Sequence, residues 1–239
     1  MAGHNKWSKI QHRKGKLDSR RAKVFSILSK EMTVSARMGG GDPGFNMRLR
    51  TLVDKAKAAN MPADNIARAI KKGTGEIPGV IYEEIVYEGY GPSGVGVIVE
   101  VTTDNKNRSA GEVRAAFTKH GGNMAGAGAV AFNFVRRGQI IIAKDKIAED
   151  KLMDMVLNAG AEDLQTFDTH YEVFTTPHGH AAVADVLAKA NIPTESSEVA
   201  FLPNTTMTLS AEDNAKLQAL VGALEEIDDV QYVWTNAEE

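Results

Sequence analysis

The chain has 239 residues, of which 43% are hydrophobic and 25% are charged. These proportions are typical of a globular protein with a packed core, and the length suits two or three domains. The sequence contains no cysteine, which excludes disulfides, thiol nucleophiles and thiolate metal ligands. No uninterrupted apolar run exceeds four residues, which is too short to span a bilayer, and lysine and arginine occupy the stretch where a signal peptide is apolar. We therefore expect a protein that is not exported and has no membrane partner.

The formal net charge of −3 conceals a strong asymmetry along the chain. Residues 1–79 contain 17 lysine and arginine residues against 6 acidic residues, which gives this end a net charge of +11. The remaining residues contain 11 basic against 25 acidic residues, a net charge of −14. A positive end suits a phosphate-rich partner, whereas an acidic body repels one. We therefore predict that residues 1–79 form a basic helical domain that binds nucleic acid.

The first part of this region is a basic arm that contains a single acidic residue, Asp18. Trp7 and His12 lie among its cations, and an exposed tryptophan in such an arm can stack on a base or enter a groove. The alternative is a solvated arm whose Trp7 ring folds back onto the protein. The nucleic-acid contacts predicted in the arm are Lys6, Trp7, Lys9, His12, Arg13, Lys14, Lys16, Arg20 and Arg21.

Three amphipathic helices are predicted after the arm. The first ends at Gly39, where a run of three glycines stops it. The second is expected to begin with Asp42 as its N-cap and to carry Phe45 on its apolar side. The third is opened by Pro62 and closed by Gly73. Their shared apolar faces predict a small three-helix domain.

Basic residues recur along the edges of these apolar faces. In the first helix they repeat every seven residues and therefore share one edge, while the second helix carries them along both edges. Basic amphipathic helices also bind acidic membranes, but here the apolar faces are needed to pack the three helices together. The phosphate contacts predicted on the helices are Lys23, Lys30, Arg37, Arg48, Arg50 and Lys55.

The sequence patterns of residues 80–239, which we call the acidic body, predict an α+β fold. The strand and helix patterns of residues 138–203 follow the order βαββαβ, which is the ferredoxin-like plan. We expect two ferredoxin-like domains, one formed by residues 80–136 plus 205–239 and the other, residues 137–204, inserted into it. Phe132 and Phe134 would share one strand face with Val130; a buried face is favoured over an RNA-stacking one.

No catalytic constellation is apparent in the sequence. The P-loop, GxSxG and HExxH signatures are absent, and the glycines of residues 121–128 do not fit a dinucleotide-binding turn. His170, His178 and His180 lack the spacing of a metal site and are expected to face solvent. We therefore predict a protein without enzymatic activity, cofactor or metal.

Several long motifs carry a family resemblance. The opening Ala2-Gly3-His4-Asn5-Lys6-Trp7 is followed by the segments 39–43, 60–62, 88–92, 104–108, 121–123 and 158–163. In these segments the chain resembles the YebC family, also called PmpR-type, with Met47 in place of an expected proline. The resemblance implies a three-domain fold with a helical N-terminal domain, in a cytoplasmic bacterial protein.

The resemblance also implies a function, in two versions. Family members are usually described as probable transcriptional regulators that bind DNA. Mitochondrial relatives act as translational activators, and bacterial members have been linked to elongation at proline-containing stretches, which makes ribosomal RNA or tRNA the alternative partner. A module that senses a ligand or binds a basic protein is a third reading of the acidic body. The oligomeric state stays open, with a monomer favoured.

Overall fold

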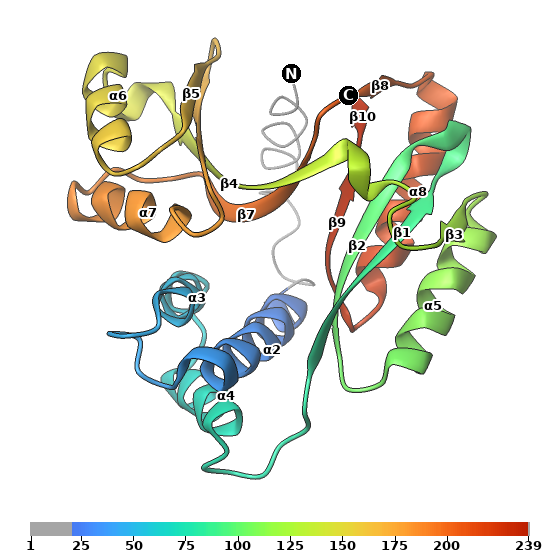
Figure 1. The fold of residues 1–239 in the computed structure, drawn as a ribbon, viewed down its shortest axis with the longest axis horizontal. Helices are drawn as coiled ribbons and strands as arrows, with labels where there is room; N and C mark the ends of the chain where they lie inside the picture. Colours follow the sequence, from blue (N-terminus) through green and yellow to red (C-terminus); the bar gives the residue numbers. More distant parts are fainter. Residues whose placement is uncertain (1–20, 239) are drawn as a thin grey trace. The chain divides into compact units, whose positions relative to one another are not determined.

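The computed structural model describes residues 21–238. It is a mixed α/β protein in which a helical region precedes two antiparallel four-stranded sheets (Figure 1), and this confirms the predicted fold class. The described chain forms two compact units, a first unit of residues 21–130 and 209–235 and a second unit of residues 131–208 and 236–238. Among the described residues, no helix is long and apolar enough to cross a membrane. The three-domain division predicted above stays a prediction.

The first unit begins with three packed helices, which we call the helical module: α2 (Arg21–Gly39), α3 (Met47–Ala58) and α4 (Ala63–Thr74). Their apolar stripes meet in one core that includes Met32, Leu49 and Ile66. Helices α2 and α4 approach closely because Gly73 has no side chain. A Cβ atom there would lie 2.4 Å from the Thr33 carbonyl oxygen.

Two predicted helix boundaries in this module are wrong. Helix α3 begins at Met47, because the Asn46 side chain accepts the Leu49 N–H and caps it. Asp42 instead caps its own turn by accepting the Gly44 N–H, as Asx turns do. Helix α4 runs past Gly73 and ends before Gly75, whose φ of +80° is the left-handed geometry of a C-cap.

The rest of the first unit is a sheet with the strand order β3-β1-β2-β9, in which every neighbouring pair is antiparallel. Two helices cover one face of this sheet (Figure 1). Along the chain the order is ββαβαβ, with the second unit inserted before the last helix and strand. The elements are β1 (Glu83–Tyr90), β2 (Gly96–Thr103), α5 (Lys106–Lys119), β3 (Asn123–Ala125), α8 (Ala211–Glu226) and β9 (Val230–Thr235).

The second unit has the order βαββαβ and the strand order β5-β6-β4-β7, which is the ferredoxin-like arrangement. Its helices pack on a core that includes Ile140, Leu152 and Val173. The elements are β4 (Phe134–Ala143), α6 (Glu149–Asn158), β5 (Asp163–Thr166), β6 (His170–Thr175), α7 (His180–Lys189) and β7 (Ser196–Pro203). The short strands β8 (Met207–Thr208) and β10 (Ala237–Glu238) pair in parallel.

The expected strand face of three residues is only partly correct. Val130 and Phe134 are buried, but Phe132 is 79% exposed. Phe132 lies in a short 3-10 turn, η2 (Ala131–Asn133), ahead of β4. The Asn133 side chain fixes that turn by donating to the Thr205 carbonyl and accepting the Thr205 N–H. The alternation of a strand therefore does not extend back to Phe132.

Candidate nucleic-acid interface

The predicted contacts of the basic arm lie outside the described residues. This applies to Lys6, Trp7, Lys9, His12, Arg13, Lys14, Lys16 and Arg20. Arg21 is the first residue of α2. Their part in nucleic-acid binding stays a prediction, and the candidate interface among the described residues lies on the helical module.

The seven-residue stripe of α2 contacts protein groups of the first unit. Lys23 donates to the carbonyl oxygens of Glu225 and Ile227, at the turn between α8 and β9. Burial lowers the pKa of the Lys23 ammonium, and the carboxylates around this turn oppose that effect. Arg37 donates to the Tyr82 carbonyl oxygen at 2.6 Å. In this structure the stripe therefore lies where α2 packs against the rest of the first unit.

Lys30, the middle residue of the stripe, reaches a buried carboxylate. Its Nζ lies 2.8 Å from Asp229 Oδ1, while Asp229 Oδ2 accepts from Arg108 at 2.6 Å, Ser109 at 2.8 Å and Thr103 at 2.9 Å. Burial raises the pKa of the Asp229 carboxyl, but these hydrogen bonds outweigh it and hold the pKa well below its usual range. Asp229 therefore joins α2 to β2 and α5.

Two of the three basic residues predicted along α3 have acidic neighbours. Arg48 pairs with Glu84 of β1. Lys55 is half-buried, and burial lowers the pKa of its ammonium while the nearby Glu31 carboxylate opposes this. Burial likewise raises the pKa of the Glu31 carboxyl. Arg50, on the other edge, is half-buried. These contacts place α3 cations within the unit's own electrostatic network.

Helix α4 carries a basic face directed to solvent. Arg68, Lys71 and Lys72 are spaced so that one face of the helix presents all three, and all are exposed. Within the described part of the chain, no ion pair or hydrogen bond occupies their side-chain nitrogens, unlike the stripe on α2. We call these three residues the α4 basic face.

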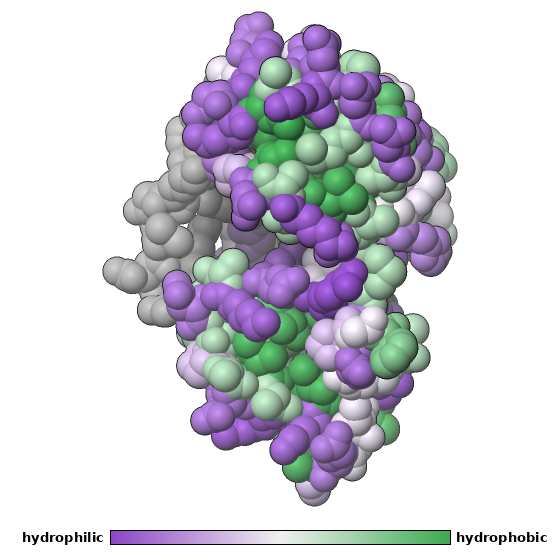
Figure 2. Space-filling view, turned by 90° about the vertical axis from the view of Figure 1, so that its left-hand side faces the viewer, coloured by the Kyte–Doolittle hydropathy of each residue, from purple (hydrophilic) through white to green (hydrophobic). Residues whose placement is uncertain are grey.

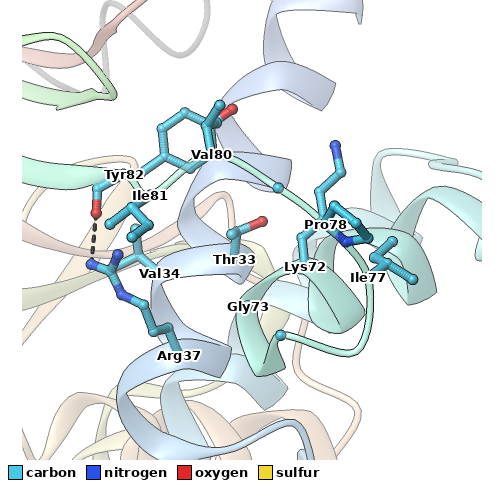
Figure 3. Close-up of a pocket in the computed structure, with 12 residues that line it drawn as sticks. Thr33, Val34, Arg37, Lys72, Gly73, Ile77, Pro78, Val80, Ile81 and Tyr82 are labelled. Atoms are coloured by element: carbon cyan, nitrogen blue, oxygen red, sulfur yellow. Dashed lines mark hydrogen bonds between the residues drawn. The ribbon is translucent and has the colours of Figure 1, made fainter.

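Two neighbouring pockets, which together we call the cleft, adjoin the α4 basic face. One part, of about 320 Å³, lies between α2 and α4 beneath the connection from Ile77 to Tyr82, with Arg37 on its α2 side and Lys72 on its α4 side (Figure 3). A second part, of about 220 Å³, is lined by Ser29, Asn65 and Arg68. Lys72 and Tyr82 line both parts. The cleft therefore combines cationic groups with hydroxyl and amide groups, a combination that suits phosphate and sugar oxygens.

The α4 basic face was not among the predicted contacts. Its signal was present in the sequence, because Arg68, Lys71 and Lys72 occupy the polar side of a helix whose apolar side holds Ile66 and Ile70. The seven-residue repeat on α2 was the more regular pattern. Regular spacing shows that side chains share a face, but it does not distinguish solvent from a protein neighbour.

Two of the three histidines expected to face solvent are buried. His170 Nε2 lies 3.2 Å from Glu172 Oε1, with both side chains fully buried. His180 Nε2 lies 3.0 Å from the Ser197 hydroxyl. The expectation is wrong because strand β6 and helix α7 direct these two rings toward the interior of the second unit. The described residues contain no group of three or more potential ligands that could hold a metal.

Figure 2 shows one face of the molecule, on which hydrophobic residues gather in patches bordered by hydrophilic ones. Some large apolar side chains are exposed outside the cores. They include Phe45, Met38 and Ile81 in the first unit and Phe132 and Leu157 in the second. Phe45, expected on the inner side of α3, is 91% exposed because it precedes the Asn46 cap.

Comparison with known proteins covers nearly the whole chain. Residues 5–76 match the model described as the TACO1/YebC protein N-terminal domain, and residues 82–237 match the TACO1/YebC second and third domain. The chain is 54% identical to a "Probable transcriptional regulatory protein" of Aromatoleum aromaticum, over 99% of this chain and 98% of that one. A protein with the same description from Geobacter sulfurreducens is 52% identical, over 99% and 95%.

A solved structure agrees with this comparison. The crystal structure of a conserved hypothetical protein from Aquifex aeolicus has a TM-score of 0.83 and 44% sequence identity to this chain, and the match covers 94% of this chain and 93% of that one. The sequence and structural similarities both extend over the helical module and the two sheets. The chain therefore belongs to the TACO1/YebC family.

Proposed function

We propose that this protein is a cytoplasmic, non-enzymatic regulator that binds nucleic acid through its basic N-terminal region. The observation that carries the proposal is the α4 basic face, which lies beside a cleft lined by Arg37 and Lys72. Its three exposed cations form no ion pair or hydrogen bond through their side chains with any of residues 21–238. Arginine and lysine that are free to face solvent are the groups that neutralise phosphates. The net charge of +11 on residues 1–79 supports the same partner.

DNA is the first candidate polymer, and transcription the first candidate process. The relatives' descriptions as probable transcriptional regulatory proteins support this choice. Phosphate contacts fix a protein on a duplex without reading its sequence. We therefore expect binding to duplex DNA that is strongly salt-dependent and shows little preference among sequences.

A ribosome-associated translation factor is the second candidate. The α4 cations would bind phosphate, which DNA and structured RNA share. None of the described helices of the module presents a row of side chains that could read bases as a recognition helix does. In this case ribosomal RNA or tRNA is the partner, and the acidic body, with its net charge of −14, faces away from it.

Sedimentation distinguishes the two candidates. Cell lysate is layered on a sucrose gradient at low and at moderate salt, with and without ribonuclease. A transcriptional regulator stays at the top of the gradient after DNase treatment, whereas a translation factor travels with ribosomal particles and is released by ribonuclease. Travel with ribosomes that withstands moderate salt would replace the DNA proposal with the translation one.

Direct binding tests the assignment of the surface. The variant Arg68→Gln/Lys71→Gln/Lys72→Gln removes three charges from the α4 basic face and leaves the module's core intact. The control Arg114→Gln/Lys119→Gln/Lys151→Gln removes three charges from exposed positions of the acidic body. We expect the first variant to bind duplex DNA and ribosomal RNA fragments at least tenfold more weakly, and the control to bind like the natural protein. Equal affinities of all three proteins would refute the assignment.

A further inference from the structure

The connection between α2 and α3 is a turn that is held in place by hydrogen bonds from a buried side chain. Gly40 adopts a φ of +85°, which favours glycine. Asn46 is buried, and besides capping α3 its amide donates to the carbonyl oxygens of Ser35 and Gly40, each at 2.9 Å. A Cβ atom on Gly39 would come within 2.8 Å of the Asn46 amide. The turn is therefore held by a buried side chain that only glycine allows to approach.

This rigid turn presents apolar side chains to solvent. Phe45 is 91% exposed, Met38 is 73% exposed and Met47 is 43% exposed, and Figure 1 shows the connection projecting from the helices. We call these three residues the apolar tip. Exposing a phenylalanine in water forgoes the burial free energy of a large apolar side chain. A well-ordered turn that does so fits a contact surface better than a flexible loop.

The surroundings of the apolar tip are cationic. A Cβ atom on Gly41 would lie 2.7 Å from the Thr74 methyl carbon and 3.1 Å from a methyl carbon of Ile70, so the turn lies close to the end of α4. Lys71 and Lys72 of the α4 basic face belong to that same last turn of α4. Arg37 directly precedes Met38, and Asp42 is the only acidic residue from position 37 to position 50. Charge complementarity therefore favours a polyanion over an apolar groove on another protein.

We propose that the apolar tip is a stacking wedge, in which the Phe45 ring covers the exposed face of an unpaired nucleobase while the α4 basic face holds the adjoining phosphates. This inference rests on the proposed function and adds the class of nucleic acid, one with unpaired bases in a loop, bulge or end. Aromatic side chains stack on any base, and phenylalanine and methionine are among the residues that enter base steps.

The test compares Phe45→Ala with Phe45→Trp and with the control Phe132→Ala, which removes another exposed ring outside the helical module. Affinity is measured by fluorescence anisotropy for two RNA probes of equal length and charge, a hairpin with an open loop and a fully paired duplex. We expect the natural protein to prefer the looped probe. Phe45→Ala should bind that probe roughly 5- to 150-fold more weakly, as expected for the loss of one stacked base.

Three further results define the outcome. Phe45→Trp and Phe132→Ala should retain the affinity for the looped probe, and the salt dependence of Phe45→Ala should equal that of the natural protein, because no phosphate contact is lost. If Phe45→Ala binds the looped probe normally, or weakens both probes equally, the stacking wedge is refuted. If the natural protein binds neither these probes nor duplex DNA, the proposed function itself fails.

Discussion

Replacing Asp229 by asparagine should destabilise the first unit strongly. The change keeps the shape of the side chain but removes its charge, and an amide nitrogen must then face either Lys30 or the Arg108–Ser109–Thr103 group. Asp229 is only 4% exposed, whereas the Arg108 side chain is 44% exposed and can gain water in place of the lost charge. Removing one member of a buried ion pair costs about 3–5 kcal/mol, and the retained hydrogen bonds reduce this. We expect a loss of about 2–4 kcal/mol in the free energy of unfolding.

Urea unfolding measures this loss in a Trp7→Phe background, where Trp234 of β9 is the only remaining tryptophan and reports on the first unit. The matched control is Asp104→Asn, since Asp104 also pairs with Arg108 at 2.8 Å but lies near solvent. The control should lose much less stability. Equal losses in Asp229→Asn and Asp104→Asn would refute the view of Asp229 as a buried junction.

The same carboxylate predicts a pH dependence. Because the folded pKa of Asp229 is depressed, its contribution to stability is complete above the unfolded pKa of about 3.9 and is lost as the pH falls through the folded pKa. The natural protein should therefore lose stability below about pH 4 more steeply than Asp229→Asn. Parallel curves for the two proteins would show that this carboxylate does not titrate with folding.

Three glycine substitutions, two in the helical module and one control on α5, test how closely the module is packed. Gly40→Ala should destabilise by about 1–2 kcal/mol, because alanine must adopt a left-handed backbone, whereas Gly111→Ala, in open space on α5, should stabilise by about 0.5–1 kcal/mol. Gly73→Ala should lower the free energy of unfolding by about 1–3 kcal/mol or more, because its Cβ would overlap the Thr33 carbonyl. Thermal melts followed by circular dichroism rank the stabilities of all three variants. A stable Gly73→Ala variant would contradict the close contact of α2 and α4.

The sequence predicted much of the fold because its signals are local. The change from helical to alternating periodicity after residue 79 marks the start of the sheets, and the order βαββαβ of residues 138–203 reappears in the second unit. The boundary errors have a local cause as well. Asp42 and Asn46 are both of residue types that cap helices. Only Asn46 is buried, and from there its side chain also donates hydrogen bonds to carbonyl oxygens of the preceding turn.

The protein contacts of the predicted cations were less predictable because they involve residues that are distant along the chain. Lys23 and Lys30 meet the turn around residues 225–229, about two hundred positions away along the chain, and no periodicity within α2 contains that information. Arg68 and Lys72 differ from the α2 cations only in the folded chain, where their side chains make no ion pair or hydrogen bond with another described residue. Burial of His170 and exposure of Phe132 likewise depend on where the chain turns between elements.

The central claim is that the α4 basic face binds phosphates, and the salt dependence of binding tests it most directly. The logarithm of the association constant for duplex DNA is measured against the logarithm of salt concentration for the natural protein and for Arg68→Gln/Lys71→Gln/Lys72→Gln. Each phosphate contact contributes about 0.9 to the slope. We predict that the variant's slope is shallower by about 2 to 3, whereas an unchanged slope would contradict the claim.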